Sequence, residues 1–95
     1  MNREAAHKLI AAQMAILRSR GYESLRDEFL DRPRVTVGVD ADGEQYELEI
    51  EAFWDDRPGG DLRVMVSLFT GGFWRRISPF TEDFIISPRG QFVGE

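Results

Sequence analysis

The sequence contains no cysteine, so neither a disulfide framework nor a thiolate metal site can stabilise the fold. It has no apolar run that approaches the roughly 20 residues needed to span a bilayer. Charged residues interrupt the first ten positions, where a signal peptide would carry its apolar segment. These absences predict a cytoplasmic protein that does not enter a membrane, and the lack of cysteine fits a reducing compartment.

Basic residues are scarce in the second part of the chain. The net charge is −5, and residues 34–95 hold six Arg against twelve Asp and Glu. An acidic surface repels phosphate backbones, so the composition argues against nucleic-acid binding. A chain of 95 residues is enough for one domain with one core, so we expect a single domain over residues 1–95.

The hydrophobic period changes once, near Pro33, from helical spacing to strict alternation. Residues 3–20 are rich in alanine and predict a first helix, with Gly21 suited to its C-terminal cap. Its apolar stripe is wide enough to cover a sheet. The stripe consists of Leu9, Ile10, Met14, Ile16 and Leu17.

A second, shorter helix is predicted over residues 24–31. Ser24 is suited to cap its first turn, and Pro33 disfavours helix in the residue before it. The apolar residues of this segment fall on one helical face. They are Tyr22, Leu25 and Phe29. We therefore expect a helical layer over residues 1–32.

Alternating apolar residues predict an antiparallel sheet over residues 34–95. Turn residues at 40–43 separate the first two strands. The expected strands are 35–39, 44–54, 62–69, 73–77 and 84–87, with 91–93 as a short edge strand. The residues expected beneath the helix are Val35, Val37, Val39, Leu48, Ile50, Val64 and Val66. The sequence thus predicts an α+β fold, with both helices on one face of a four- to five-stranded antiparallel meander sheet.

The face of the sheet turned away from the helix carries an unexpected apolar set. If Val64 and Val66 face the helix, Met65 and its neighbours on adjacent strands face outward. Exposed apolar patches of this kind usually mark interfaces. The candidate interface residues are Phe53, Arg63, Met65, Phe69, Trp74 and Arg76.

The loop over residues 55–61 is a second candidate site. Loops on a rigid sheet often carry binding residues, although Asp, Pro and Gly also serve any tight connection. The candidate residues are Trp54, Asp55, Asp56 and Arg57.

No catalytic, cofactor or metal site is expected. His7, the only histidine, has no neighbouring group that would orient it for catalysis and is expected on a solvated helix surface. Asp40, Asp42 and Glu44 resemble the start of a calcium loop, but Gln45 replaces the required glycine, which favours a hairpin turn.

A row of glutamates follows the second strand at a period of two. Such a row could bind cations or raise the pKa of one carboxyl. We interpret it instead as a solvated face paired with Arg63, Arg75 or Arg76. The row consists of Glu47, Glu49 and Glu51.

Two segments of the chain, 46–65 and 81–95, are similar to segments of small stand-alone bacterial proteins of unknown function. That resemblance implies no catalytic residue. The order of a helix followed by a sheet also resembles that of cystatin-like domains, which implies a fold and not an activity.

The sequence predicts a non-enzymatic module, immunity-like or adaptor-like, that binds a protein partner or a second copy of itself through the open sheet face. The alternative is a small-molecule-binding domain, with a pocket between helix and sheet near Trp54 or Tyr46.

Overall fold

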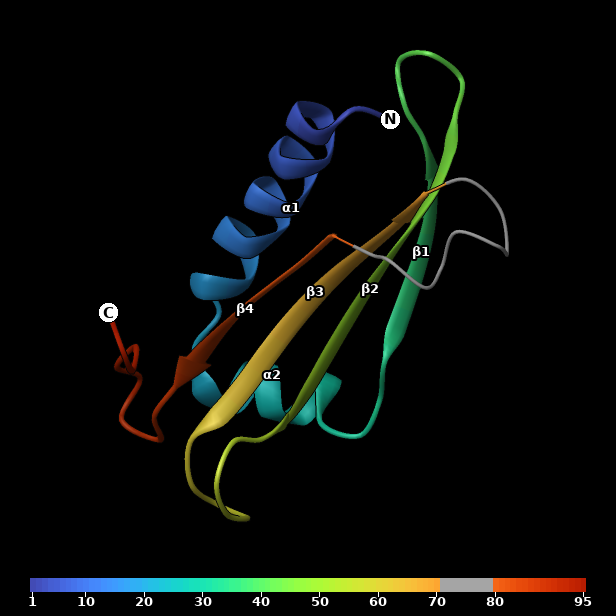
Figure 1. Ribbon diagram of the computed structural model, residues 1–95. Helices are drawn as coiled ribbons and strands as arrows, with labels where there is room; N and C mark the ends of the chain where they lie inside the picture. The colour runs from blue at the N-terminus through green and yellow to red at the C-terminus, as the bar shows by residue number, and fades with distance from the viewer. Residues whose placement is uncertain (71–79) are drawn as a thin grey trace.

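The computed structural model describes residues 1–70 and 80–95, which fold into two layers (Figure 1). The helices lie on one face of an antiparallel sheet of order β1-β2-β3-β4. Helix α1 packs over β3 and β4, and α2 packs over β2 and β3. The elements are α1 (Arg3–Arg18), α2 (Tyr22–Phe29), β1 (Arg34–Val39), β2 (Gln45–Trp54), β3 (Leu62–Thr70) and β4 (Phe80–Ile86). The predicted α+β architecture is confirmed.

Helix α1 begins at a cap that the sequence analysis missed. The Asn2 side chain accepts a hydrogen bond from the Ala5 N–H at 2.8 Å, as N-cap residues do. The buried residues of the helix are Ala6, Ile10 and Leu17. The prediction that Ile16 belongs to this face is wrong, because Ile16 lies at its margin and is 58% exposed.

Helix α2 buries its three predicted residues and begins earlier than expected. Gly21, with φ of 85°, is its N-cap and not the C-cap of α1, which is Ser19. Positive φ is costly for other residues, so glycine suits the sharp turn between the helices. Ser24 lies inside α2 and does not cap it. Instead, the Ser24 hydroxyl accepts hydrogen bonds from the Arg20 guanidinium at 2.8 and 3.0 Å.

The predicted inward positions of β2 and β3 form the core. Alternate residues of these strands face the helices and are almost completely buried. They are Leu48, Ile50, Ala52, Leu62, Val64, Val66 and Leu68, joined by Phe84 and Ile86 of β4.

Strand β1 contradicts the prediction that its valines lie beneath the helix. Val37 pairs with Glu47 and Val35 with Glu49, so the valines share the face of the glutamates, away from the helices. The three valines are 49%, 62% and 60% exposed in chain order. On the helix side, Gly38 lies opposite Tyr46, whose ring fills the space that a side chain at position 38 would need.

The β1–β2 turn explains this register. Asp40 and Gly43 form a hydrogen-bonded turn, Gly43 has φ of 82°, and the Asp40 N–H donates to the Glu44 carbonyl at 2.9 Å. This is a three-residue hairpin loop, a type I turn followed by a left-handed residue. Counting outward from the pair of Asp40 and Glu44 places every valine of β1 opposite the outward row of β2.

Strand β4 also differs from the prediction. It begins at Phe80 and pairs directly with β3, Leu68 opposite Phe80, so the expected strand 84–87 is only its second half. The expected strand 73–77 lies outside the described residues. Residues 91–93 return beside β4 as expected, through a bridge between Ile86 and Phe92.

Candidate functional site

The open face is the side of the sheet that the helices do not cover. Cross-strand partners in an antiparallel sheet point to the same side, so the register assigns its members. From β1 to β4 they are Val35, Val37, Val39, Gln45, Glu47, Glu49, Glu51, Phe53, Arg63, Met65, Ser67, Phe69, Thr81, Asp83 and Ile85.

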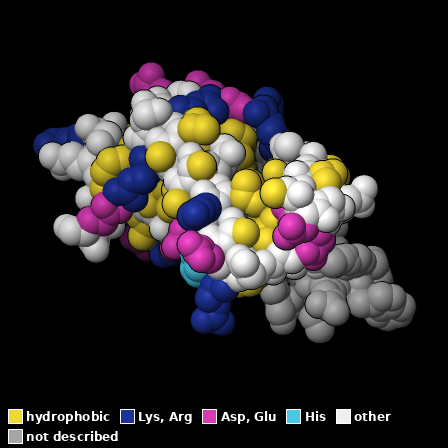
Figure 2. Space-filling model, turned by 90° about the horizontal axis from the view of Figure 1, so that it is seen from above, with side chains coloured by type: hydrophobic (Ala, Val, Ile, Leu, Met, Phe, Trp, Pro, Cys, Tyr) yellow, Lys and Arg dark blue, Asp and Glu magenta, His cyan; other side chains and the backbone are white. Residues whose placement is uncertain are grey.

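Apolar side chains are exposed on this face. The valines of β1 are among the most exposed large hydrophobic residues in the described chain, and Phe53 of β2 is 37% exposed. Met65 and Phe69 are half-buried. Seen from the end that carries the β1–β2 turn, hydrophobic side chains reach the surface between charged ones (Figure 2). The surface therefore offers apolar area that the protein's own core does not use.

Four of the six predicted interface residues lie on the open face as expected. They are Phe53, Arg63, Met65 and Phe69. The other two, Trp74 and Arg76, lie outside the described residues. The valines of β1 were missed as members of this face, because they were assigned to the core.

Charged groups form a pattern between the apolar ones. Glu49 lies between Val35 of β1 and Ser67 of β3, and Glu51 lies beside Met65. Of the three arginines predicted to pair with this row, Arg75 and Arg76 lie outside the described residues, and Arg63 does not pair with it. The Arg63 guanidinium binds two aspartates instead, one at each side.

These aspartates fix Arg63 at the margin of the open face. Asp55 accepts at 2.7 and 3.0 Å, and Asp83 accepts on the other side. The hydrogen bond to Asp55 is the largest cause that raises the pKa of Arg63 above its ordinary value, and the hydrogen bond to Asp83 is the second. Arg63 is thus already bound by two carboxylates. The acidic part of the face is the glutamate row of β2.

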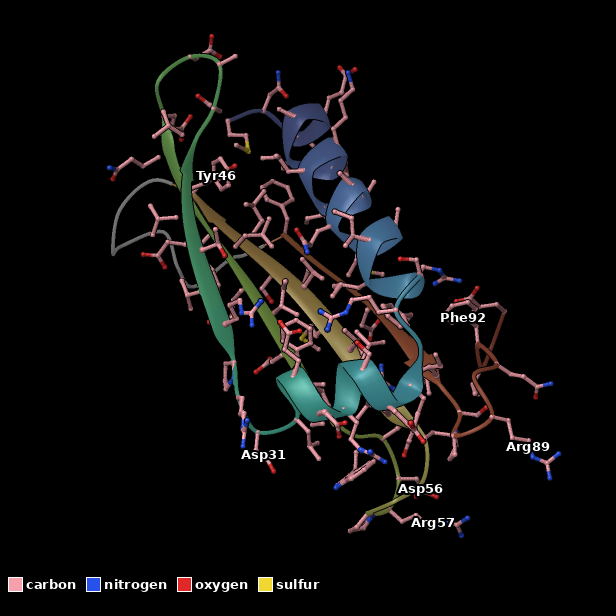
Figure 3. All side chains as sticks on the ribbon, turned by 180° about the vertical axis from the view of Figure 1, so that it is seen from behind. Asp31, Tyr46, Asp56, Arg57, Arg89 and Phe92 are labelled. Atoms are coloured by element: carbon pink, nitrogen blue, oxygen red, sulfur yellow. The ribbon has the colours of Figure 1, made fainter. Side chains whose placement is uncertain are left out.

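The predicted loop site does not converge on a cavity. Trp54 packs against the hydrophobic core, and Asp55 holds Arg63. Asp56 and Arg57 are exposed and lie in the β2–β3 loop at the far end of the molecule (Figure 3). The four residues therefore do separate tasks, and two of them support the fold.

A buried hydrogen bond fastens this loop to the helical layer. The Tyr22 hydroxyl of α2 donates to the Gly60 carbonyl at 2.7 Å. In residues 1–70 and 80–95, no buried side-chain nitrogen or oxygen lacks a hydrogen-bond partner. The helix–sheet interior that these residues build thus offers no unpaired side-chain nitrogen or oxygen to a ligand.

A shallow depression lies at the surface near the α1–α2 connection. It has a volume of about 450 Å³, is wide open to solvent, and is bounded by residues 20–24 and 88–90. It is lined by the connection between the helices, the first turn of α2 and the turn at 88–90, and neither Trp54 nor Tyr46 takes part in it.

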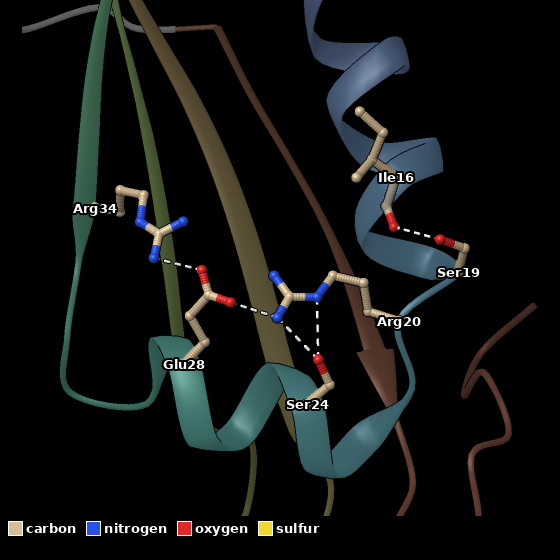
Figure 4. A network of polar contacts seen from close by, with 6 residues as sticks. All are labelled: Ile16, Ser19, Arg20, Ser24, Glu28 and Arg34. Carbon is tan, nitrogen blue, oxygen red and sulfur yellow. Dashed lines mark hydrogen bonds and ion pairs between the residues drawn. The ribbon is translucent and has the colours of Figure 1, made fainter.

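A polar network joins β1 to both helices (Figure 4). Glu28 of α2 is bound by two arginines, Arg20 in the connection between the helices and Arg34 at the start of β1. The hydrogen bond from Arg20 is the largest cause that lowers the pKa of Glu28, and the charge of Arg34 adds to it. The network anchors the first residue of β1 to the helical layer.

The remaining polar candidates have structural surroundings. His7 is exposed and lies edge-on to the Phe80 ring, 6.2 Å between centroids. One Asp40 carboxylate oxygen accepts from the backbone N–H groups of Asp42 and Glu44, at 2.9 and 2.8 Å. The predicted hairpin turn is therefore confirmed, with that oxygen committed to the turn.

Within the described part of the chain, no group of three or more His, Asp or Glu side chains is placed to hold a metal ion. Neither described helix combines the length and apolar character needed to cross a bilayer. The site with the clearest physical signature is thus the open face.

Comparison of the chain with models of protein families, with curated proteins and with solved structures found no match.

Proposed function

We propose that this chain is a protein-binding module, adaptor-like or immunity-like, whose recognition surface is the open face. The observation that carries the proposal is the exposure of Val35, Val37, Val39 and Phe53 on one side of the sheet. The valines follow one another along β1, whereas Phe53 lies farther along the same face, beyond Glu49 and Glu51. Exposed apolar side chains that gather on one face typically mark interaction sites on folded domains. A partner that covers them removes apolar surface from water, which favours association.

The charges of the face specify the partner's chemistry. The apolar residues of β1 and β3 flank the acidic row of β2, in which Glu49 and Glu51 have no ion-pair partner among residues 1–70 and 80–95. Burying these carboxylates without a cation would be costly. We infer that the partner presents Lys or Arg side chains between two apolar strips.

The test is site-specific photo-crosslinking in the cells that make this chain. A photoreactive phenylalanine analogue replaces Phe53 or Met65 on the open face. The same analogue at the exposed Ile16 of α1 serves as the control. We expect one adduct of defined mass from positions 53 and 65 and none from position 16. The adduct from position 53 should disappear when Glu51→Lys is added, because the partner's cation then meets a like charge.

The linked protein is next identified by mass, and its binding to the native chain and to Met65→Glu is measured with purified components. A loss of affinity of roughly tenfold or more is expected, as for central interface residues. Equal adducts from positions 53 and 16, or unchanged affinity of Met65→Glu, would contradict the proposal.

A further inference from the structure

The outer edge of β1 carries unpaired backbone groups. The Asp40 N–H bonds across to β2, and the pairing alternates along an antiparallel ladder, so the even-numbered residues of β1 bond to β2. The N–H and C=O groups of Val35, Val37 and Val39 therefore point away from the sheet. In residues 1–70 and 80–95, no strand pairs with this side of β1.

An edge strand with unpaired backbone groups can pair with a strand of another chain. Proteins usually protect an edge with charged residues, proline or a bulge. In β1, Arg34 and the preceding Pro33 lie at one end only, and the residues whose backbone faces outward are all valines. Among the described residues, the edge is therefore open over the length of the strand, and its side chains favour β structure.

One antiparallel register makes β1 complementary to itself. If Val37 pairs with Val37 of a second copy, Val35 pairs with Val39 in both directions. Every outward N–H and C=O of the valines then has a partner, because residues with outward groups face one another. The valine side chains of the two copies form one continuous apolar strip on the open face.

The charges agree with the same register. It brings Arg34 of each copy, which also binds Glu28 of its own chain, opposite Asp40 of the other copy, so that opposite charges face each other at both ends of the junction. A shift of the second strand by two residues either way leaves a valine unpaired and separates these charges. The other contact between copies, open face against open face, would oppose two acidic rows. The edge, and not the face, is thus self-complementary.

We propose that a second copy of this chain pairs with β1 along its outer edge, in the register centred on Val37, and joins two sheets into one continuous eight-stranded sheet. The inference rests on the proposed function, since it extends the open face across the junction and names one occupant of its border. Two-fold symmetry follows, because each copy offers the same strand to the other.

Amide hydrogen exchange of the native chain gives a test without substitution. In the free chain, the amides of Val35, Val37 and Val39 face solvent, whereas those of Thr36 and Gly38 are bonded within the sheet. Raising the protein concentration should slow exchange at the three valines by tenfold or more and leave the other two unchanged. Sedimentation should show the mass doubling over the same range.

Cysteine crosslinking tests the register in a chain that has no other cysteine. Cα atoms of a hydrogen-bonded pair lie about 5.5 Å apart, which a disulfide spans. Val37→Cys should therefore form a linked dimer under mild oxidation. A mixture of Val35→Cys and Val39→Cys should give mainly the mixed disulfide, because identical positions are about 14 Å apart. Thr81→Cys, exposed on β4, is the control and should remain monomeric.

A monomer at all concentrations would overturn the inference, as would a dimer in which the valine amides exchange freely. A dimer that Met65→Glu abolishes and Val37→Cys does not crosslink would place the contact on the face and equally overturn it. The proposed function is decided separately, by the adducts and affinities of Phe53 and Met65 variants. A chain that crosslinks a partner at positions 53 and 65 but remains monomeric would support the proposed function and contradict the edge dimer. A chain that forms the edge dimer but crosslinks nothing at positions 53 and 65 would contradict the proposed function alone.

Discussion

The replacement of Gly38 by alanine tests whether the Tyr46 ring requires a residue without a side chain on the helix side of β1. A Cβ atom at position 38 would lie 2.3 Å from Cζ and 2.4 Å from Oη of Tyr46. Carbon atoms do not approach so closely, so the Tyr46 ring must swing away from the core cluster that it contacts. Inserting a group into a packed site typically costs about 1–3 kcal/mol. Because Tyr46 is only partly buried, we expect a loss near the lower end, about 1 kcal/mol.

The same substitution should change sign when the ring is removed. In a Tyr46→Leu background, Gly38→Ala meets no aromatic ring and restrains a strand residue, which should stabilise the chain by about 0.5–1 kcal/mol. Urea unfolding monitored by tryptophan fluorescence, at one fixed protein concentration, measures all four chains of the cycle. If Gly38→Ala is neutral or stabilising in the native chain, the Tyr46 ring does not hold this space, and our explanation of the glycine at position 38 is refuted.

Three further substitutions test contacts that hold the layers together. Tyr22→Phe leaves the buried Gly60 carbonyl without its donor and should lower the free energy of unfolding by about 1–2 kcal/mol, with an unchanged urea dependence. Phe92→Leu removes the ring that lies 4.1 Å from the Arg18 guanidinium and should cost about 0.5–1.5 kcal/mol in thermal unfolding. Adding Arg18→Gln should cost less in the Phe92→Leu chain than in the native chain, because only the contacts of Arg18 with Glu95 and Phe84 then remain to be lost. Glu28→Gln should be less stable than the native chain above the ordinary carboxyl pKa, because two arginines lower the pKa of Glu28 in the folded state. That difference should shrink as the pH falls from about 7 to below the folded-state pKa, and a constant difference in urea unfolding would show that the charge of Glu28 is not its source.

The sequence was sufficient where two neighbouring strands shared a strong alternation. In β2 and β3, the apolar set that includes Leu48 and Val66 has a period of two and a polar or mixed opposite set. Only one of the two sets can meet a helical layer, so the pattern itself identifies the buried face. The same logic placed Phe53 and Met65 on the open face, where the structure has them.

The facing of β1 could not be obtained in this way. Alternation shows that the three valines share a face, but it does not say which one. That depends on register, and register depends on one residue of loop length. A two-residue loop would place Val37 opposite Tyr46, on the helix side. The three-residue loop that ends at Gly43 places Val37 opposite Glu47, on the open face. Gly38 opposite Tyr46 was the available signal, since only a residue without a side chain leaves room for the ring.

The apolar side of β1 faces away from the helices, although the stability of the domain would require an apolar side that faces them. Toward the helices the strand presents Arg34, Thr36 and Gly38, and toward the open face it presents only valine. The helices pack over the other three strands, so polar residues at the valine positions would leave the core intact. Apolar residues there instead raise the risk of unspecific strand pairing at an unprotected edge. The proposed function accounts for a strand that carries this risk without benefit to the core, because a partner that covers the open face would bury its valines.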